Sequence, residues 1–272
     1  MAESSSILLN IAFTLSVWKS ISITFSINSI TIILERSNNM KENPREEIEK
    51  LIQKGDLEAL LRKAAELHGH FCSYLAYGVK AAYIAVKEIG SKNVGMEEIV
   101  AIVETNNCFS DGIQIISGCT FGNNALIYKD VGKTAVTLTK RGGTAIRIVL
   151  DPIYEASIET EYPEANELWE KIVVKREEAT PQEQSRLMEL FAEGAFKELK
   201  KPADKMFRIT RMKINTPSYA PIFNSVICPV CGEKTYKPTM RNGKIVCMDC
   251  AEANYYFLDG KGIQQNHTSL KS

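Results

Sequence analysis

The residues of this 272-residue chain that are best suited to chemistry are histidines and cysteines, and they occur in two groups. The first group lies in "ELHGHFCSY" (66–74), where His68, His70 and Cys72 take alternate positions although the chain has only three histidines. Imidazole nitrogens and a thiolate sulfur are a matched donor set for zinc or a similar divalent ion. A cysteine in the first turn of a helix is also a better nucleophile, because the helix N-terminus lowers the pKa of its thiol. The pattern therefore predicts a metal site or a thiolate site.

Two more cysteines and an aspartate follow in "NNCFSDGIQIISGCTFG" (106–122). We expect Cys108 and Asp111 at the start of a short helix and Cys119 in the turn after it, where reactive groups usually gather. A buried cysteine is more often an inert small hydrophobe, and this alternative applies most to Cys119. The candidate residues of a core metal or ligand cleft are His68, His70, Cys72, Cys108 and Cys119, and the candidate catalytic residues are Cys72, Cys108 and Asp111.

The second group is "CPVCGEKTYKPTMRNGKIVCMDC" (228–250), in which fifteen residues separate two Cys-x2-Cys pairs. This spacing is typical of structural zinc sites with four thiolates. The predicted zinc ligands are Cys228, Cys231, Cys247 and Cys250. Asn242-Gly243 predicts a type I′ hairpin between the pairs, and a helix predicted over 248–257 completes a treble-clef finger. A unit of about 35 residues buries too little core to fold alone, so zinc binding is expected to drive its folding.

The elements that must position the first group have patterns typical of an α+β fold. Helices are predicted over 44–54, 56–67, 71–90, 110–118 and 181–202, and strands over 97–105, 124–130, 133–140, 144–150 and 205–215. Asp56 is the expected N-cap of the second helix, and Ser110 or Asp111 that of the fourth. His68 and His70 are expected in an extended stretch, pointing the same way. No crossover helix fits between the three middle strands, so we expect helices packed on a mainly antiparallel sheet.

Composition predicts five parts along the chain. They are a leader (1–39), the α+β core (44–215), a proline-bearing linker (216–225), the zinc finger (226–258) and a tail (259–272). The apolar, serine-rich leader is expected to be a mis-assigned start or poorly ordered, with a membrane anchor as the alternative that Lys19 opposes. The 33 basic and 33 acidic residues create no global field, so we expect no strong nucleic-acid binding and no clear membrane association. Two Cys-x2-Cys pairs in a chain with seven cysteines favour metal ligation in a cytoplasmic setting.

Three segments resemble the core of the FmdE family, which takes its name from one of the subunits of formylmethanofuran dehydrogenase. They are "ELHGHFCSYLAYGVKAA", "VETNNCFSDGIQIISGCTFGNNALIYKDVGKTA" and "TAIRI", and the similarity runs from about residue 57 to 215. The C-terminal finger resembles the treble-clef module that some members carry. The resemblance implies an α+β core, a homodimer, and a zinc-binding cleft at His68, His70, Cys72, Cys108, Asp111 and Cys119. Many relatives have proline after the cysteine of HGHxC, whereas Ser73 stands here, which leaves the geometry of the cleft open.

The resemblance implies a zinc-binding, methanogenesis-related protein that is an accessory subunit or factor of formylmethanofuran dehydrogenase or molybdoenzyme metabolism. The redox reaction needs a molybdenum or tungsten pterin and iron–sulfur clusters, and the chain has no CxxCxxCxxxCP run, so whether it is itself an enzyme stays open. One alternative is a stand-alone enzyme with Cys72 as nucleophile or with a second zinc or other divalent metal held by the His/Cys group. Another is a nucleic-acid-binding or protein-binding module that acts through the finger.

Overall fold

The computed structural model describes residues 43–90 and 93–266, and the chain divides into two units, Met1–Asn43 and Pro44–Ser272. The leader expected over 1–39 lies outside the described residues. The helices are α2 (Glu46–Lys54), α3 (Leu57–His68), α4 (Ser73–Ile89), α5 (Phe109–Ser117), α6 (Pro152–Glu159), α7 (Pro163–Trp169), the π-helix η1 (Glu170–Val174), α8 (Pro181–Lys200), α9 (Ala203–Met206) and α10 (Met248–Ala251). The strands are β1 (Ile99–Val103), β2 (Leu126–Tyr128), β3 (Ala135–Lys140), β4 (Thr144–Leu150), β5 (Phe207–Lys213), β6 (Val226–Ile227), β7 (Lys234–Thr235), β8 (Pro238–Arg241), β9 (Lys244–Cys247), β10 (Tyr255–Asp259) and β11 (Gly262–Asn266). Within this described part, no helix combines the length and the apolar character that crossing a membrane requires.

The core of the second unit is a five-stranded sheet with the strand order β2-β1-β3-β4-β5. Strand β3 pairs antiparallel with β1 and β4, and β4 pairs antiparallel with β5, which confirms the expected mainly antiparallel α+β sheet. Strand β2 is the exception, because it pairs with β1 in parallel. Helix α5 lies between β1 and β2 in the chain and serves as their crossover connection. The antiparallel pairing expected between residues 124–130 and 133–140 was therefore wrong.

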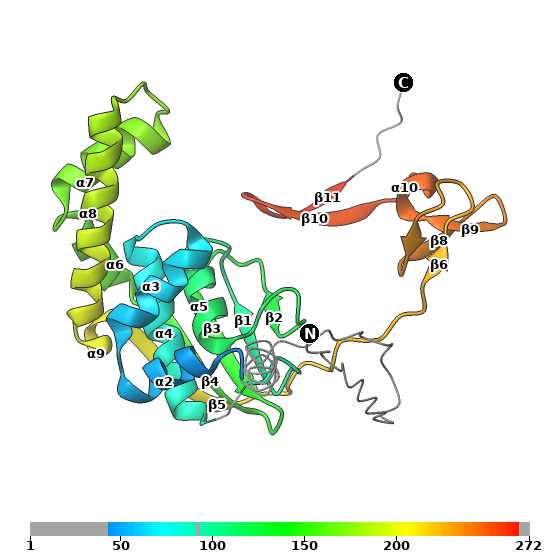
Figure 1. Cartoon of the computed structure of the whole chain (residues 1–272), viewed down its shortest axis with the longest axis horizontal. Helices are drawn as coiled ribbons and strands as arrows, with labels where there is room; N and C mark the ends of the chain where they lie inside the picture. The colour runs from blue at the N-terminus through cyan, green and yellow to red at the C-terminus, as the bar shows by residue number, and fades with distance from the viewer. Residues whose placement is uncertain (1–42, 91–92, 267–272) are drawn as a thin grey trace, which may run out of the picture. The chain divides into compact units, whose positions relative to one another are not determined.

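Helices α3, α4 and α5 lie together on one side of this sheet (Figure 1), and α4 contacts β3 and β4 directly. Asp56 caps α3 as predicted, since its Oδ1 accepts a hydrogen bond from Ala59 N at 3.0 Å. The expectation that Ser110 or Asp111 caps α5 was wrong. Helix α5 begins at Phe109, whose N–H donates to the side chain of Asn107 at 3.0 Å, so that Cys108 occupies the N-cap position.

Two glycines allow α4 and α5 to pack with their backbones in contact. A Cβ atom at Gly78 would overlap the carbonyl oxygen of Phe109, and one at Gly112 would lie 2.6 Å from Val79 N. These positions therefore admit no side chain. Because each glycine lies within two turns of the start of its helix, this contact also fixes the two helix N-termini beside each other.

A buried glutamate anchors residues 151–180, which lie outside the helices and strands predicted from the sequence. The segment forms α6, α7 and η1. The carboxylate of Glu198, on α8, is fully buried and accepts hydrogen bonds from Tyr77 (3.1 Å), Tyr162 (3.0 Å) and Tyr154. Lys201 Nζ lies 2.9 Å from the same carboxylate and supplies the opposite charge. Since these tyrosines come from α4, α6 and the start of α7, one polar cluster joins the helices around α8.

The linker after β5 is held against the core for part of its length. The Arg141 guanidinium lies 3.7 Å from the ring centroid of Tyr219 and 2.9 Å from Glu97 Oε2, which also accepts from Ala220 N at 3.1 Å. Beyond the linker, β6 pairs with β7 and β8 with β9. The helix predicted over 248–257 ends at Ala251, because Glu252 takes the left-handed conformation with φ 53°. The aromatic residues after it form the β10–β11 hairpin, so the predicted end of the finger at 258 falls inside this hairpin.

Replacement of Gly78 by alanine is expected to lower the free energy of unfolding by about 1–3 kcal/mol, because the added methyl group forces α4 and α5 apart. Urea unfolding followed by circular dichroism measures the change. Gly122→Ala is the matched control, since a Cβ atom there meets no other atom within 4 Å. A Gly78→Ala variant as stable as the control would contradict the close backbone contact.

Candidate metal centres

The structure brings together four of the predicted donors, His68, His70, Cys72 and Cys108. One nitrogen or sulfur atom from each lies within 4.8 Å of the others. His68 is the last residue of α3, and Gly69 ends this helix in the left-handed conformation with φ 90°. The chain turns there, so the two imidazole rings lie beside each other with centroids 4.4 Å apart. One donor atom of each ring lies in the group, but a helix C-cap brings the rings together, so the extended stretch expected at His68 was wrong.

The two thiols of this centre lie at the N-termini of neighbouring helices. Cys72 is the N-cap of α4, where its Sγ accepts a hydrogen bond from Leu75 N at 3.4 Å, and Cys108 is the N-cap of α5. The hydrogen bond from the Cys72 thiol, together with the neighbouring His68, lowers the pKa of Cys108 to about 6 against the opposing effect of burial. The pKa of Cys72 is raised by the same hydrogen bond and by burial. Without a metal the pair therefore holds one proton, with the negative charge on Cys108.

Asp111 lies behind His68. Its Oδ2 is 2.7 Å from His68 Nδ1, and its Oδ1 accepts from Gln114 Nε2 at 3.0 Å. The other imidazole nitrogen, Nε2, is 4.0 Å from Cys72 Sγ and faces the other donors. A carboxylate that fixes the far nitrogen of a histidine is the usual support of a metal-ligating imidazole. The geometry thus gives Asp111 an orienting position.

The donor set fits a divalent ion of the zinc type. Two imidazole nitrogens and two sulfurs suit zinc and similar borderline-soft metals. Bond lengths of about 2.0–2.3 Å would place the donors of a tetrahedral ion roughly 3.3–3.8 Å apart. Since all four donors already lie within 4.8 Å of one another, only small side-chain movements separate this arrangement from coordination.

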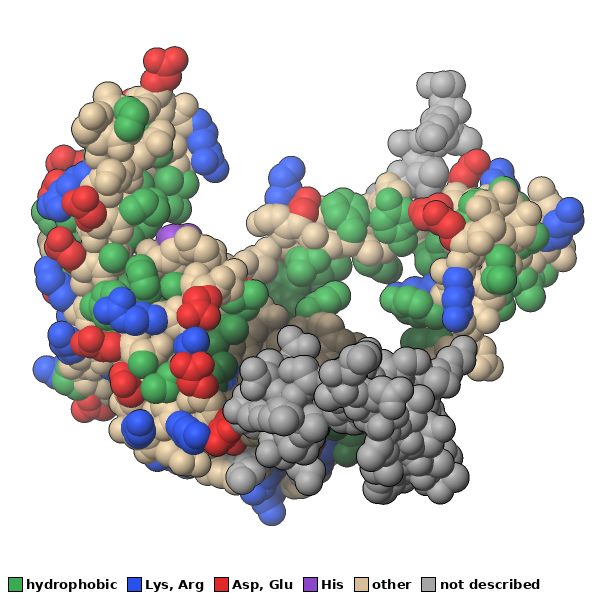
Figure 2. All heavy atoms as spheres, in the orientation of Figure 1, with side chains coloured by type: hydrophobic (Ala, Val, Ile, Leu, Met, Phe, Trp, Pro, Cys, Tyr) green, Lys and Arg blue, Asp and Glu red, His purple; other side chains and the backbone are tan. Residues whose placement is uncertain are grey.

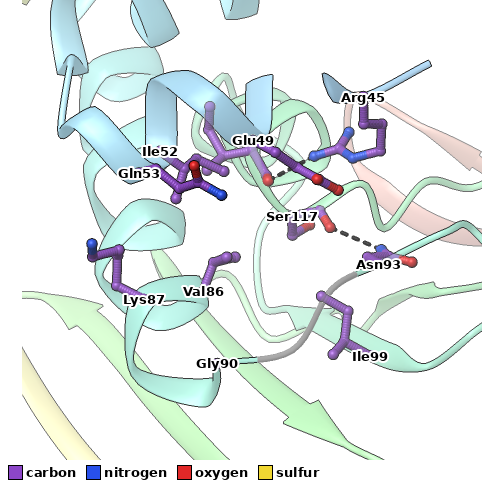
Figure 3. Close-up of a pocket in the computed structure, with 11 residues that line it drawn as sticks. Arg45, Glu49, Ile52, Gln53, Val86, Lys87, Gly90, Asn93, Ile99 and Ser117 are labelled. Carbon is purple, nitrogen blue, oxygen red and sulfur yellow. Dashed lines mark hydrogen bonds between the residues drawn. The ribbon is translucent and has the colours of Figure 1, made fainter. Parts of the chain in front are cut away.

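Cys119 lies outside this group of four. Its fully buried thiol donates to the carbonyl of Ile99 at 3.5 Å and accepts from Asn93 Nδ2 at 3.7 Å, and burial raises its pKa to about 11. Asn93, Ile99 and Ser117 line a cavity of about 250 Å³ (Figure 3), where Asn93 Nδ2 also donates to the Ser117 carbonyl at 2.8 Å. The structure therefore places Cys119 with packing residues near this cavity, as in the alternative weighed from sequence.

The four C-terminal cysteines form the second candidate centre. The sulfur atoms of Cys228, Cys231, Cys247 and Cys250 lie within 4.8 Å of one another. Backbone N–H groups, that of Cys231 foremost, lower the pKa of Cys228 to about 6. The predicted type I′ turn is confirmed, because Asn242 and Gly243 have φ values of 50° and 73° and connect β8 to β9. The pairs thus meet because this hairpin folds the intervening residues back.

Three residues near the first centre had not been singled out from sequence. Gln114 follows Asp111 by three positions on α5, a spacing that places two side chains on one helix face and was therefore available as a signal. Phe191 lies with its ring centroid 6.4 Å from that of His70, and Trp169 lies 5.8 Å from Phe191. These two come from distant segments, and no local pattern marks them as neighbours of the histidines.

Three of the matches of this chain to known proteins show what the chain resembles. A family model described as "FmdE, Molybdenum formylmethanofuran dehydrogenase operon" matches residues 67–208. A protein of Archaeoglobus fulgidus named "Probable S-adenosyl-L-methionine-binding protein" is 37% identical over 214 residues, which cover 76% of this chain and 56% of that protein, so the chain spans little more than half the length of this relative. A solved structure of an FmdE-like protein of the tungsten formylmethanofuran dehydrogenase type, from Syntrophus aciditrophicus, matches with a TM-score of 0.44 and 24% identity, covering 66% of this chain and 85% of that one.

Asp111→Asn is expected to weaken metal binding at the first centre by about 10–100-fold, because an amide holds His68 Nδ1 less firmly than a carboxylate does. Competition with a chromophoric chelator measures the affinity of the full chain. Glu66→Gln, a change of the same kind at an exposed position on α3, is the control. Equal affinities of the two variants would contradict the orienting position of Asp111.

Proposed function

Because this chain belongs to the FmdE family, whose model covers residues 67–208, we propose that it is a zinc-binding accessory subunit or factor of formylmethanofuran dehydrogenase or of a related molybdoenzyme. The observation that carries the proposal is the meeting of His68, His70, Cys72 and Cys108 donor atoms within 4.8 Å. These donors come from three helix ends, and Asp111 supports one of them, as a metal site requires.

The two centres have different proposed roles. The C-terminal centre offers four thiolates, which close the coordination sphere of zinc and make the metal structural. The first centre lies within the segment that the family model matches, so it is the better candidate for the family's common function. When bound there, zinc supplies positive charge and a Lewis-acid centre. The protein contributes a thiolate at Cys108, an oriented imidazole at His68, and helix N-termini that stabilise the thiolates.

The cysteine content supports an accessory role over an independent redox role. Four of the seven cysteines belong to the C-terminal centre, two to the first centre, and Cys119 is buried apart from both. The sequence lacks the CxxCxxCxxxCP run that binds iron–sulfur clusters in bacterial ferredoxins. In this proposal electron transfer comes from another protein of the complex. A cytoplasmic homodimer that contacts formylmethanofuran dehydrogenase subunits is the assembly we propose.

Two other functions have a specific observation in their favour. The stand-alone enzyme with Cys72 as nucleophile has Cys108 as a second candidate, because the hydrogen bond from Cys72 and the neighbouring His68 lower the pKa of the Cys108 thiol. The 37% identity to the Archaeoglobus protein favours binding of S-adenosyl-L-methionine. Equilibrium dialysis with radiolabelled S-adenosyl-L-methionine tests the second function. Retention that the unlabelled compound abolishes would support it, and no retention would contradict it for this chain.

Elemental analysis of the purified full chain is expected to find two zinc ions per molecule. Cys72→Ala/Cys108→Ala should retain one, because removal of two of four ligands abolishes tight binding at the first centre, and Cys228→Ala/Cys231→Ala should retain the other. Cys119→Ala is the control and should keep both ions. A single zinc ion that is unaffected by the Cys72 and Cys108 changes would overturn the proposed function of the first centre. Co-purification of the tagged chain with formylmethanofuran dehydrogenase subunits, or its failure, tests the accessory role.

A further inference from the structure

The four donors of the first centre are supported unequally. His68 Nδ1 is fixed by Asp111, and Cys72 Sγ accepts a backbone N–H from Leu75. The His70 ring, in contrast, receives no hydrogen bond from any residue that the structure describes, and its ring neighbours are His68 and Phe191. A ligating histidine almost always donates its second N–H to a fixed acceptor, which holds the ring in place. His70 is therefore the least restrained donor of the four.

A row of aromatic rings leads from His70 to the surface. The centroid of Phe191, on α8, lies 6.4 Å from that of His70, and Trp169, at the end of α7, lies 5.8 Å from Phe191. Both separations are within the range of favourable aromatic contacts. The packing of α7 against α8 does not cover the whole of Trp169, because 44% of its surface is exposed. Histidine atoms are visible at the surface of the molecule (Figure 2).

The backbone beside Trp169 is also unusual. The π-helix η1 begins at Glu170, directly after the tryptophan. Such π-helical turns are rare and occur frequently at functional sites, because the extra residue redirects the side chains around it. The exposed indole thus lies where the helix changes its geometry, on the aromatic row that ends at the donors.

We propose that His70 is an exchangeable ligand, and that Phe191 and Trp169 form an aromatic seat for a small planar molecule whose nitrogen or sulfur donor replaces it. Release of His70 leaves His68, Cys72 and Cys108, and three protein ligands with one open position are the arrangement of zinc sites that bind substrate. The ligand class is a flat conjugated ring that carries one soft donor. This inference rests on the proposed metal centre and adds the kind of molecule that the centre accepts.

The first test compares the two histidines in the full chain. The His70→Ala variant is expected to keep the metal of the first centre with about a tenfold loss of affinity. The affinity of the His68→Ala variant should be at least about tenfold lower still, because Asp111 orients only His68. Metal content and chelator competition measure both. If wild type binds no metal at the first centre, the proposed function fails; if wild type binds it and the two variants lose it equally, only the exchange of His70 is overturned.

The second test uses the cobalt(II)-substituted chain and two thiols of similar size, benzenethiol and cyclohexanethiol. The His70→Ala protein is titrated with each, and the thiolate-to-cobalt absorption is recorded after subtraction of the C-terminal centre, measured in Cys72→Ala/Cys108→Ala. Phe191→Leu or Trp169→Leu in the same background should weaken the binding of benzenethiol several-fold and leave the binding of cyclohexanethiol unchanged. Phe196→Leu, the same change on α8 at a ring that contacts Phe71, is the control. An equal loss of binding for the two thiols, or no effect of the Phe191 and Trp169 changes, would overturn the aromatic seat.

Discussion

The contact between the backbones of α4 and α5 is the constraint on which the first centre depends. Gly78 and Gly112 allow the two helices to approach until no side chain fits between them, and their N-terminal residues, Cys72 and Cys108, are carried to the same place. Helix α4 is itself enclosed by the hydrophobic core, with ten of its seventeen residues buried. The thiols are therefore positioned by core packing, and a metal ion would find them assembled.

The electrostatics of the centre follow from the same arrangement. Without a cation, the ionisation of both thiols at the neighbouring helix N-termini is unfavourable, because the two thiolates would repel each other. The pair therefore keeps one proton, and Cys108 carries the negative charge. Asp111 adds a second negative charge, that of a carboxylate, behind His68. Because a divalent cation relieves the repulsion between these groups and displaces the shared proton, metal binding and thiol ionisation are coupled.

Residue type and spacing predicted the donors better than the partners of those donors. The HGHxC segment and Cys108 stood out because histidine is scarce and because helix starts favour thiolates, and the structure places all four donor atoms together. Local patterns also located Asp56 as a cap and Gly90 as the end of α4. The local patterns did not exclude Cys119 from the predicted cleft, because the burial of a residue depends on the distant segments that pack over it. The parallel position of β2 escaped prediction for a related reason, because the route of a crossover is set by packing between distant segments.

The two centres belong to separate hydrophobic clusters of very different size. The core cluster contains thirty buried residues, whereas that of the finger consists of Cys228, Val246 and Cys247, two of which are candidate ligands. In the finger, the bound ion would therefore supply most of the stability that a hydrophobic core supplies in an ordinary domain. A chelator or an oxidant would therefore unfold the finger and leave the sheet and its helices folded. A sample with too little metal then contains some molecules with a folded finger and some with an unfolded one. Its heat denaturation has no single melting temperature.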